Sequence, residues 1–210
     1  MAVLRPADKA DRDDAAAFAG RVARWDPAGP VRLKAFADGS VRIFATTPFD
    51  SLVSRTISGE LDPRDITVYA GNLLSGLAVA VDTNVDPGQV VDSLWRSQLP
   101  PAAGWIAVDT VPAQLLTDLA DQGTSQARDN PGPAGGASTA LLDTEVLTVS
   151  GAGMHVVVPL RMLFALSGMG FAPQSEGEQV RVSATDSWVR IDARFGAVLR
   201  RRHSLLPLLL

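Results

Sequence analysis

The chain has no cysteine and only two histidines among its 210 residues. The lack of cysteine excludes disulfide bonds and thiolate metal sites. No His-Glu-x-x-His helix is present, and the two histidines, His155 and His203, are not neighbours in the sequence, so we expect no zinc site. His155 falls on an expected strand, where a lone histidine is more often hydrogen-bonded or exposed than catalytic.

The chain also lacks the glycine-rich loops that hold phosphates and dinucleotides. It contains no G-x-x-x-x-G-K-[ST] sequence, no G-x-G-x-x-G spacing between a strand and a helix, and no G-x-S-x-G nucleophile turn. We therefore expect no cofactor. The formal net charge of −4 does not favour a general affinity for DNA or for anionic lipid.

Long hydrophobic runs are missing as well. The longest apolar stretch, Leu73–Val81, is much shorter than the roughly 20 residues that span a bilayer. The polar and charged first residues, Met1–Asp14, are not those of a secretory signal peptide. We therefore expect a soluble, cytoplasmic protein that does not bind a membrane.

The most informative feature that is present is an internal repeat. Residues 31–55 read VRLKAFADGSVRIFATTPFDSLVSR, and residues 180–201 read VRVSATDSWVRIDARFGAVLRR. Both stretches alternate apolar and polar residues as strands do, and the first contains an Asp-Gly hairpin turn. A strand and a helix are expected before each copy, which predicts an α/β fold of the α+β type with duplicated βαβββ units and mainly antiparallel sheet. Convergence of two amphipathic hairpins is the alternative explanation.

The repeat aligns particular apolar residues and divides the chain. Val41 and Ile43 align with Val189 and Ile191, and Phe49 aligns with Phe195. We expect one compact domain or two intimately packed halves. The segments are a first βαβββ unit (1–60), strand–helix segments with a helix over Pro87–Leu99 (61–128), a flexible Gly/Pro-rich linker (129–139), a second βαβββ unit (140–202) and an apolar tail (203–210).

Two resemblances rest on these phrases. The stretches "FADGSVRIFATTPFDSLVSRTI" and "VVVPLRMLFALSGMG" are similar to parts of a bacterial DNA sliding clamp domain, which implies a clamp-like arrangement of the elements. The stretches "GWIAVDTVPAQLL" and "LLDTEVLTVSG" resemble a family of uncharacterised actinobacterial proteins, and that resemblance implies no function.

The clamp resemblance is weaker for function than for fold. Sliding clamps surround DNA with basic helix faces, because attraction to phosphates is independent of sequence. Here the helix expected over residues 8–25 mixes aspartates with basic residues, and the one expected over residues 112–122 is acidic through Asp118 and Asp121. One chain also has too few copies of the unit to close a ring. We therefore do not expect nucleic acid to be a partner.

Three carboxylates are candidates for acid–base chemistry. Asp109 lies at the end of one expected strand, and Asp143 and Glu145 share a face of another. Two carboxylates buried together could transfer protons, but carboxylates on the solvent face of a strand are commoner. We therefore name no catalytic residue and favour a protein that is not an enzyme.

The candidate binding residues lie near the end of the sequence. A basic cluster could bind phosphate or an acidic partner, or it could protect an edge strand from pairing. The apolar residues after this cluster must be shielded from water, by a groove of the same domain, by a second copy of the chain or by a partner protein. The candidates are Arg194, Arg200, Arg201, Arg202, Leu205 and Leu206.

These observations favour a non-catalytic cytoplasmic binding or scaffold protein. We expect a protein partner or self-association, with a homodimer as one form. The alternatives are an enzyme with unrecognised carboxylate chemistry and a nucleic-acid-associated relative of the sliding clamps.

Overall fold

The structure is a computed structural model that describes residues 2–81, 83–129, 131–132, 136–172, 175 and 177–202. The chain divides into two compact units. Unit 1 comprises Met1–Pro48 and Leu52–Gln98, and unit 2 comprises Phe49–Ser51 and Leu99–Leu210. The short segment Phe49–Ser51 therefore belongs to unit 2, although the sequence on both sides of it belongs to unit 1.

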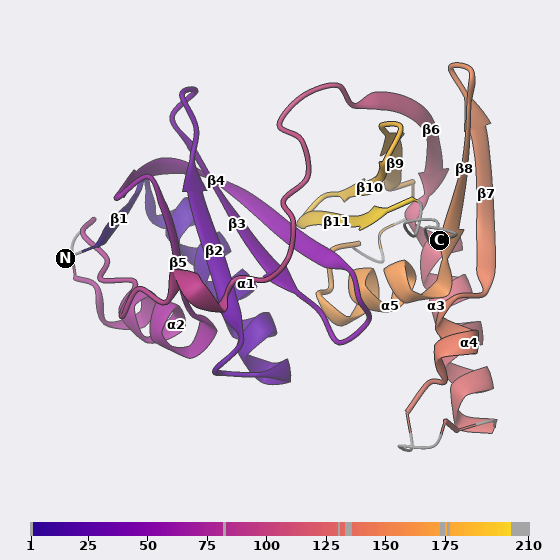
Figure 1. Cartoon of the computed structure of the whole chain (residues 1–210), viewed down its shortest axis with the longest axis horizontal. Helices are drawn as coiled ribbons and strands as arrows, with labels where there is room; N and C mark the ends of the chain where they lie inside the picture. The colour runs from indigo at the N-terminus through magenta and orange to yellow at the C-terminus, as the bar shows by residue number, and fades with distance from the viewer. Residues whose placement is uncertain are drawn as a thin grey trace, which may run out of the picture. The chain divides into compact units, whose positions relative to one another are not determined.

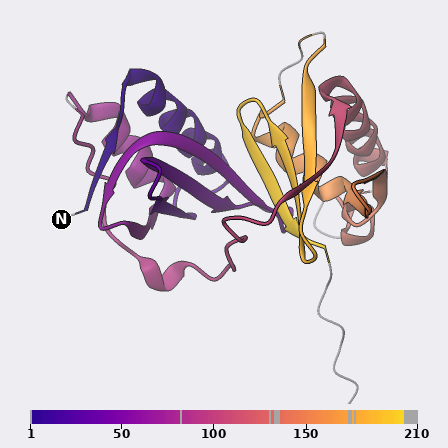
Figure 2. The ribbon, with the colours of Figure 1, turned by 90° about the horizontal axis from the view of Figure 1, so that it is seen from above.

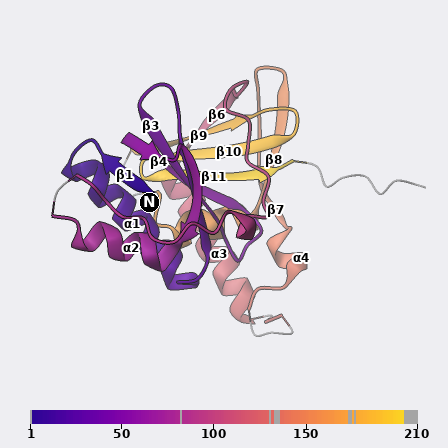
Figure 3. The same cartoon turned by 60° about the vertical axis from the view of Figure 1, so that its left-hand side comes forward.

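Unit 1 is an antiparallel sheet with two helices. Its strands are ordered β5-β2-β3-β4, and β1 pairs with β4. Helices α1 and α2 lie side by side (Figure 3). The elements are β1 (Val3–Pro6), α1 (Lys9–Trp25), β2 (Pro30–Ala35), β3 (Ser40–Thr46), β4 (Leu52–Asp62), β5 (Asp65–Tyr69), α2 (Ala70–Val79) and a 3-10 turn over Asp92–Leu94 (Figure 1).

Local signals account for the helix and the hairpin that begin unit 1. The Asp8 carboxylate caps α1 by accepting a hydrogen bond from the Asp11 amide at 2.9 Å. At the β2–β3 turn, Gly39 has φ +77, a conformation that favours glycine. Hydrogen bonds from the Ser40 hydroxyl and amide lower the pKa of Asp38, and they close this turn. The helix and the hairpin expected here are confirmed.

Unit 2 contains a four-stranded antiparallel sheet in the order β11-β10-β9-β6 and a separate hairpin of β7 and β8. Figure 2 shows the yellow strands with the rose helix α3 on one side of them. The elements are β6 (Ile106–Pro112), α3 (Ala113–Asp129), α4 (Thr139–Leu142), β7 (Glu145–Gly151), β8 (Met154–Pro159), α5 (Leu160–Gly168), β9 (Gln179–Ala184), β10 (Trp188–Ala193) and β11 (Gly196–Arg201).

The structure confirms the α+β fold and the duplicated βαβββ order. The first copy is β1-α1-β2-β3-β4 and the second is β8-α5-β9-β10-β11. The aligned Val41, Ile43, Val189 and Ile191 are all buried on β3 and β10, the middle strands of the two three-stranded repeats. The aligned phenylalanines differ, because Phe49 packs edge-on against Phe164 at 5.7 Å between ring centroids, whereas Phe195 is exposed in the β10–β11 turn.

The helix expected over Pro87–Leu99 is wrong, because this segment follows β5 instead of coiling. The Asp92 carboxylate accepts a hydrogen bond from the Thr67 amide at 2.6 Å, and the Val91 amide donates to the Thr67 carbonyl at 2.7 Å. Only the turn Asp92–Leu94 is helical.

Two other expected segments fall on the limits of the described residues. The linker 129–139 is described only in part, between the end of α3 and the start of α4, and the tail 203–210 lies outside the described residues. Among the helices that the structure describes, none is long and apolar enough to cross a membrane.

Candidate functional site

Four charged side chains of unit 2 meet in what we call the arginine–aspartate cluster: Arg161, Arg200, Asp50 and Asp143. Arg161 lies in the first turn of α5, and Arg200 lies on β11. Asp143 is the C-cap residue of α4. Asp50 lies in the segment Phe49–Ser51, with the left-handed φ of 51 that aspartate tolerates better than most residues. The cluster is formed by segments that are distant in the sequence.

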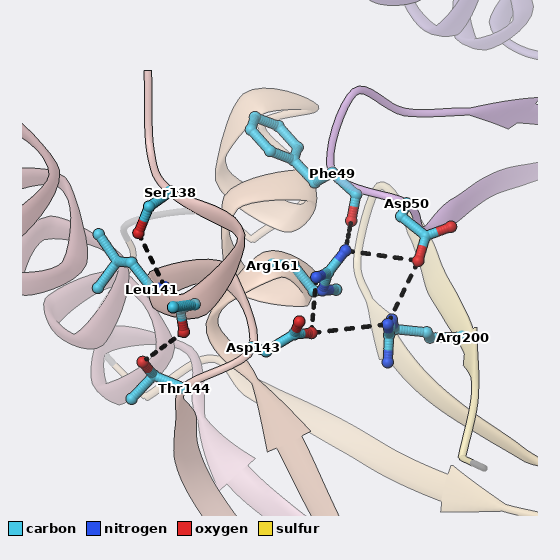
Figure 4. Close-up of polar contacts among 9 residues, drawn as sticks. Phe49, Asp50, Ser138, Leu141, Asp143, Thr144, Arg161 and Arg200 are labelled. Carbon is cyan, nitrogen blue, oxygen red and sulfur yellow. Dashed lines mark hydrogen bonds and ion pairs between the residues drawn. The ribbon is translucent and has the colours of Figure 1, made fainter. Parts of the chain in front are cut away.

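The contacts of the cluster form a closed set (Figure 4). The Arg161 Nη2 donates to Asp143 Oδ1 at 2.6 Å, and its Nη1 donates to the Phe49 carbonyl at 3.1 Å. The same Nη1 lies 3.4 Å from Asp50 Oδ2. The Arg200 Nη2 lies 3.3 Å from Asp50 Oδ2 and 3.8 Å from Asp143 Oδ1. Each guanidinium group therefore contacts both carboxylates.

Local structure holds Asp143 in place. The Ser138 hydroxyl caps α4 by accepting a hydrogen bond from the Leu141 amide, and the Thr144 hydroxyl donates to the Ala140 carbonyl (Figure 4). The Leu160 amide donates to the Thr144 carbonyl at 2.9 Å, which joins the start of α5 to the end of α4. Asp143 and Arg161 are thus positioned by two neighbouring helix termini.

The cluster is closed on the arginine side and open on the aspartate side. The Arg161 side chain is 6% exposed and the Arg200 side chain 26%, against 50% for Asp143 and 80% for Asp50. The Nε atoms of both arginines are buried and have no hydrogen-bond partner among the described residues. A buried cation needs paired anions, so Arg161 requires at least one of the two aspartates.

A small cavity of about 220 Å³ lies between α3 and α5. It is lined by Leu116, Thr117, Leu163, Leu166, Ser167, Gly170 and Ala172. Its volume is below the several hundred Å³ typical of pockets for drug-sized ligands. The cavity is therefore suited to one side chain of a partner more than to a cofactor.

The structure brings only one of the four expected arginines into the cluster. Successive residues of a strand point to opposite faces, so Arg201 points away from Arg200, and Arg202 follows the last residue of β11. Arg201 lies over the Trp188 ring at 6.0 Å, and Arg202 donates to the Thr185 and His155 carbonyls. Arg194 lies 3.8 Å from Glu178 and over the Phe195 ring, while Leu205 and Leu206 lie outside the described residues.

Asp109, Asp143 and His155 each contact different polar groups. The expectation that Asp143 lies on a strand is wrong, because Asp143 is the C-cap of α4 and β7 begins only at Glu145. The exposed Asp109 accepts a hydrogen bond from the neighbouring Thr110 amide at 2.7 Å. His155 Nδ1 lies 2.9 Å from the Ser150 hydroxyl. In the described parts of the chain, no three acidic or histidine side chains form a group that could hold a metal.

The sequence did not reveal Arg161 and Asp50 as members of a site. Arg161 is the single charge in an apolar helix, and a lone charge among buried residues is the signal that could have found it. Asp50 follows the phenylalanine that the repeat alignment singled out, but nothing local indicates its partner 111 residues away.

The chain matches two models of domains of unknown function. Residues 100–205 match a domain of unknown function named DUF8185, and residues 1–97 match a second one named DUF8010. No curated protein sequence matches the chain significantly.

Solved structures of bacterial sliding clamps share the fold over nearly the whole chain. The DNA polymerase sliding clamp of Caulobacter crescentus is 17% identical, with a TM-score of 0.60 over 99% of this chain and 67% of the clamp chain. A putative DNA polymerase III beta subunit of Eubacterium rectale is 14% identical, with a TM-score of 0.60 over 97% of this chain and 65% of the other chain. The clamp of Bacillus subtilis is 14% identical, with a TM-score of 0.58 over 99% of this chain and 66% of the clamp chain. This chain therefore has a sliding-clamp-like fold and spans about two thirds of the length of those clamps.

Proposed function

Because this chain belongs to the DUF8185 family of unknown function, its surface is the guide to its role, and we propose that it is a non-catalytic protein-binding scaffold with a clamp-like fold. We place it in the cytoplasm, as a monomer or homodimer that binds a protein partner. The observation that carries this proposal is the cavity between α3 and α5, next to the acidic surface of α3.

This surface has the composition of a recognition site for one protein side chain. Leu115 is exposed next to Leu116, which lines the cavity, and Asp118 and Asp121 are exposed on the same helix. Asp121 lies one helical turn after Thr117, which lines the cavity. Fully buried apolar anchors carry most of the energy of protein interfaces, and charges at their rim direct association. The surface supports binding of a partner with an apolar anchor and basic flanks.

The test is to fill the cavity without changing the fold. Partners of the chain are first cross-linked in cells, identified by mass spectrometry and purified. We expect Ser167→Trp, at the cavity, to weaken the affinity of the purified partner by about tenfold or more, as loss of an interface anchor does. Ser75→Trp on the exposed side of α2, in unit 1, is the matched control and leaves the affinity unchanged.

Two results would count against this function. One is equal partner affinity for the two tryptophan variants. The other is turnover of a defined metabolite that is lost in Asp109→Asn or His155→Ala, because it would show that the chain is an enzyme.

A nucleic-acid-binding clamp relative is the second candidate, favoured by an arginine group in unit 1. Burial, together with repulsion from the nearby Arg24 and Arg55, lowers the pKa of Arg21. Arg55 is paired with Asp14, so Arg21 and Arg24 are the members available to phosphate. Closely spaced guanidinium groups of this kind attract polyanions.

Salt dependence separates the two candidates. A nucleic-acid-binding protein would bind duplex DNA at low salt, and its affinity would fall steeply with salt. Arg21→Gln and Arg24→Gln would then reduce the slope by about one each, whereas Arg96→Gln would leave it unchanged. We expect no retention on DNA at low salt, and steep salt-dependent binding would support the second candidate instead.

A further inference from the structure

Two guanidinium groups of the arginine–aspartate cluster converge on a single carboxylate oxygen of Asp50 (Figure 4). We propose that this position is a binding site for a phosphate group, either as inorganic phosphate or at the end of a small phosphomonoester, and that Asp50 covers it as an internal substitute. The site is independent of the protein partner proposed above.

The Asp50 carboxylate is held loosely. Its Oδ2 lies 3.4 Å from the Arg161 Nη1 and 3.3 Å from the Arg200 Nη2. Hydrogen bonds between a guanidinium group and a carboxylate are normally about 2.7–2.9 Å long. The Asp50 side chain is also largely exposed, so water competes for it. By contrast, Asp143 binds Arg161 at 2.6 Å and is the fixed anion of the cluster.

Both arginines have unused hydrogen-bonding capacity. The Nε atoms of Arg161 and Arg200 are buried and have no partner among the described residues. An unsatisfied buried donor destabilises the folded state, so its retention in a folded chain calls for an explanation. One carboxylate oxygen satisfies few donors, whereas a tetrahedral phosphate offers several oxygens to two guanidinium groups together.

The charges and donors of the cluster favour an anion with several acceptor oxygens. Two arginines and two aspartates balance, and when Asp50 moves away the remaining three groups carry one net positive charge. A phosphate monoester near neutral pH carries a charge of about −1.5 to −2. Chloride or a free carboxylate carries less charge and offers fewer acceptors, so it would compete poorly for the same donors.

The exposed fractions of the four side chains indicate that a phosphate group would enter the site from the side of Asp50. Arg161 forms the buried floor, Arg200 is half-buried, and Asp143 and Asp50 face solvent. The Asp50 backbone has a left-handed φ, which is disfavoured for residues other than glycine. Release of its side chain therefore removes a contact that holds the backbone in a less favourable conformation. The site admits the phosphate end of a small molecule.

The experiment measures phosphate binding to the full chain by isothermal titration calorimetry at low salt. Asp50→Asn keeps the size of the side chain and removes its charge. We expect it to raise the affinity for inorganic phosphate by about tenfold, since a competing negative charge within contact distance is removed in partly exposed surroundings. The matched control Asp186→Asn changes another exposed aspartate of unit 2 and leaves the affinity unchanged.

A second substitution tests the donor. Adding Arg200→Gln to Asp50→Asn should abolish the gained affinity, and circular dichroism verifies that the double variant is folded. Glycerol 2-phosphate binding more tightly than inorganic phosphate would identify a phosphomonoester as the ligand, and the reverse order would identify free phosphate. If Asp50→Asn binds neither compound better than the unchanged chain does, or if binding persists without Arg200, the proposal is wrong.

Discussion

Helices α1 and α3 have the same length of 17 residues but opposite charge balance. Four basic and three acidic side chains lie on α1, whereas α3 has one basic and three acidic side chains. Burial of apolar residues fixes the place of a helix on its sheet, whereas charges on its exposed face are free to change. A clamp-like fold can therefore retain its backbone while the net charge of its helices differs between the two units.

The arginine–aspartate cluster gives unit 2 its largest expected sensitivity to a single substitution. We expect Arg161→Ala to lower the free energy of unfolding by about 3 kcal/mol, because breaking a buried ion pair also removes the bond to the Phe49 carbonyl. Arg200→Ala should cost about 1 kcal/mol or less, since its contacts are longer and more exposed. Urea unfolding of the variants measures both, and equal losses would contradict the assignment of Arg161 as the buried member.

The helix pair α3–α5 and the helix pair α1–α2 should respond differently to one added methyl group. A Cβ on Gly123 of α3 would lie 2.5 Å from Leu160 Cδ1, whereas a Cβ on Gly20 of α1 would lie 3.7 Å from Leu74 Cδ1. Gly123→Ala should therefore destabilise the chain by roughly 1–2 kcal/mol through overpacking. Gly20→Ala should stabilise it by up to about 1 kcal/mol through helix propensity. Melting temperatures that shift in the same direction would contradict this difference in packing.

The smallest expected effect is a loss of unfolding free energy at low pH that depends on Asp65 of unit 1. Burial alone would raise the pKa of Asp65, but hydrogen bonds from Arg32 and Lys34 outweigh it and lower this pKa from its ordinary value. A carboxyl group with a lowered pKa in the folded state stabilises the protein above its unfolded pKa, and this stability is lost as the pH falls. The free energy of unfolding should therefore decline more for the unchanged chain than for Asp65→Asn as the pH falls from about 5 to about 3, the range in which an aspartate of the unfolded chain takes up its proton. Parallel pH profiles would show that the Arg32–Asp65 pair contributes nothing.

The sequence predicted those elements whose signals are local. The helix expected over residues 8–25, which Asp8 caps, and the Asp38-Gly39 turn depend on neighbouring residues, and both were found. The helix expected over Pro87–Leu99 was wrong because hydrogen bonds to Thr67, on another strand, determine its path. Contacts of this kind cannot be read from periodicity.

The candidate site was harder to predict than the fold. The pattern of three consecutive arginines pointed to Arg200 but not to its partners, because Arg201 points to the other face of β11 and Arg202 follows the end of the strand. Arg161 and Asp50 are brought together only by folding over more than a hundred residues. The chemistry of the cluster depends on this distant pairing and therefore becomes visible only in the structure.

The hydrogen bond between Asp109 and Thr110 bears on how copies of the chain can associate. In the described part of unit 2, β6 is the last strand of its sheet, and its pairing with β9 shifts register between Ala107 and Asp109. An incoming strand needs straight backbone with available amides, but here the Asp109 side chain already occupies the Thr110 amide and adds a negative charge. An added strand would therefore lose a backbone hydrogen bond at Thr110 and meet the charge of Asp109.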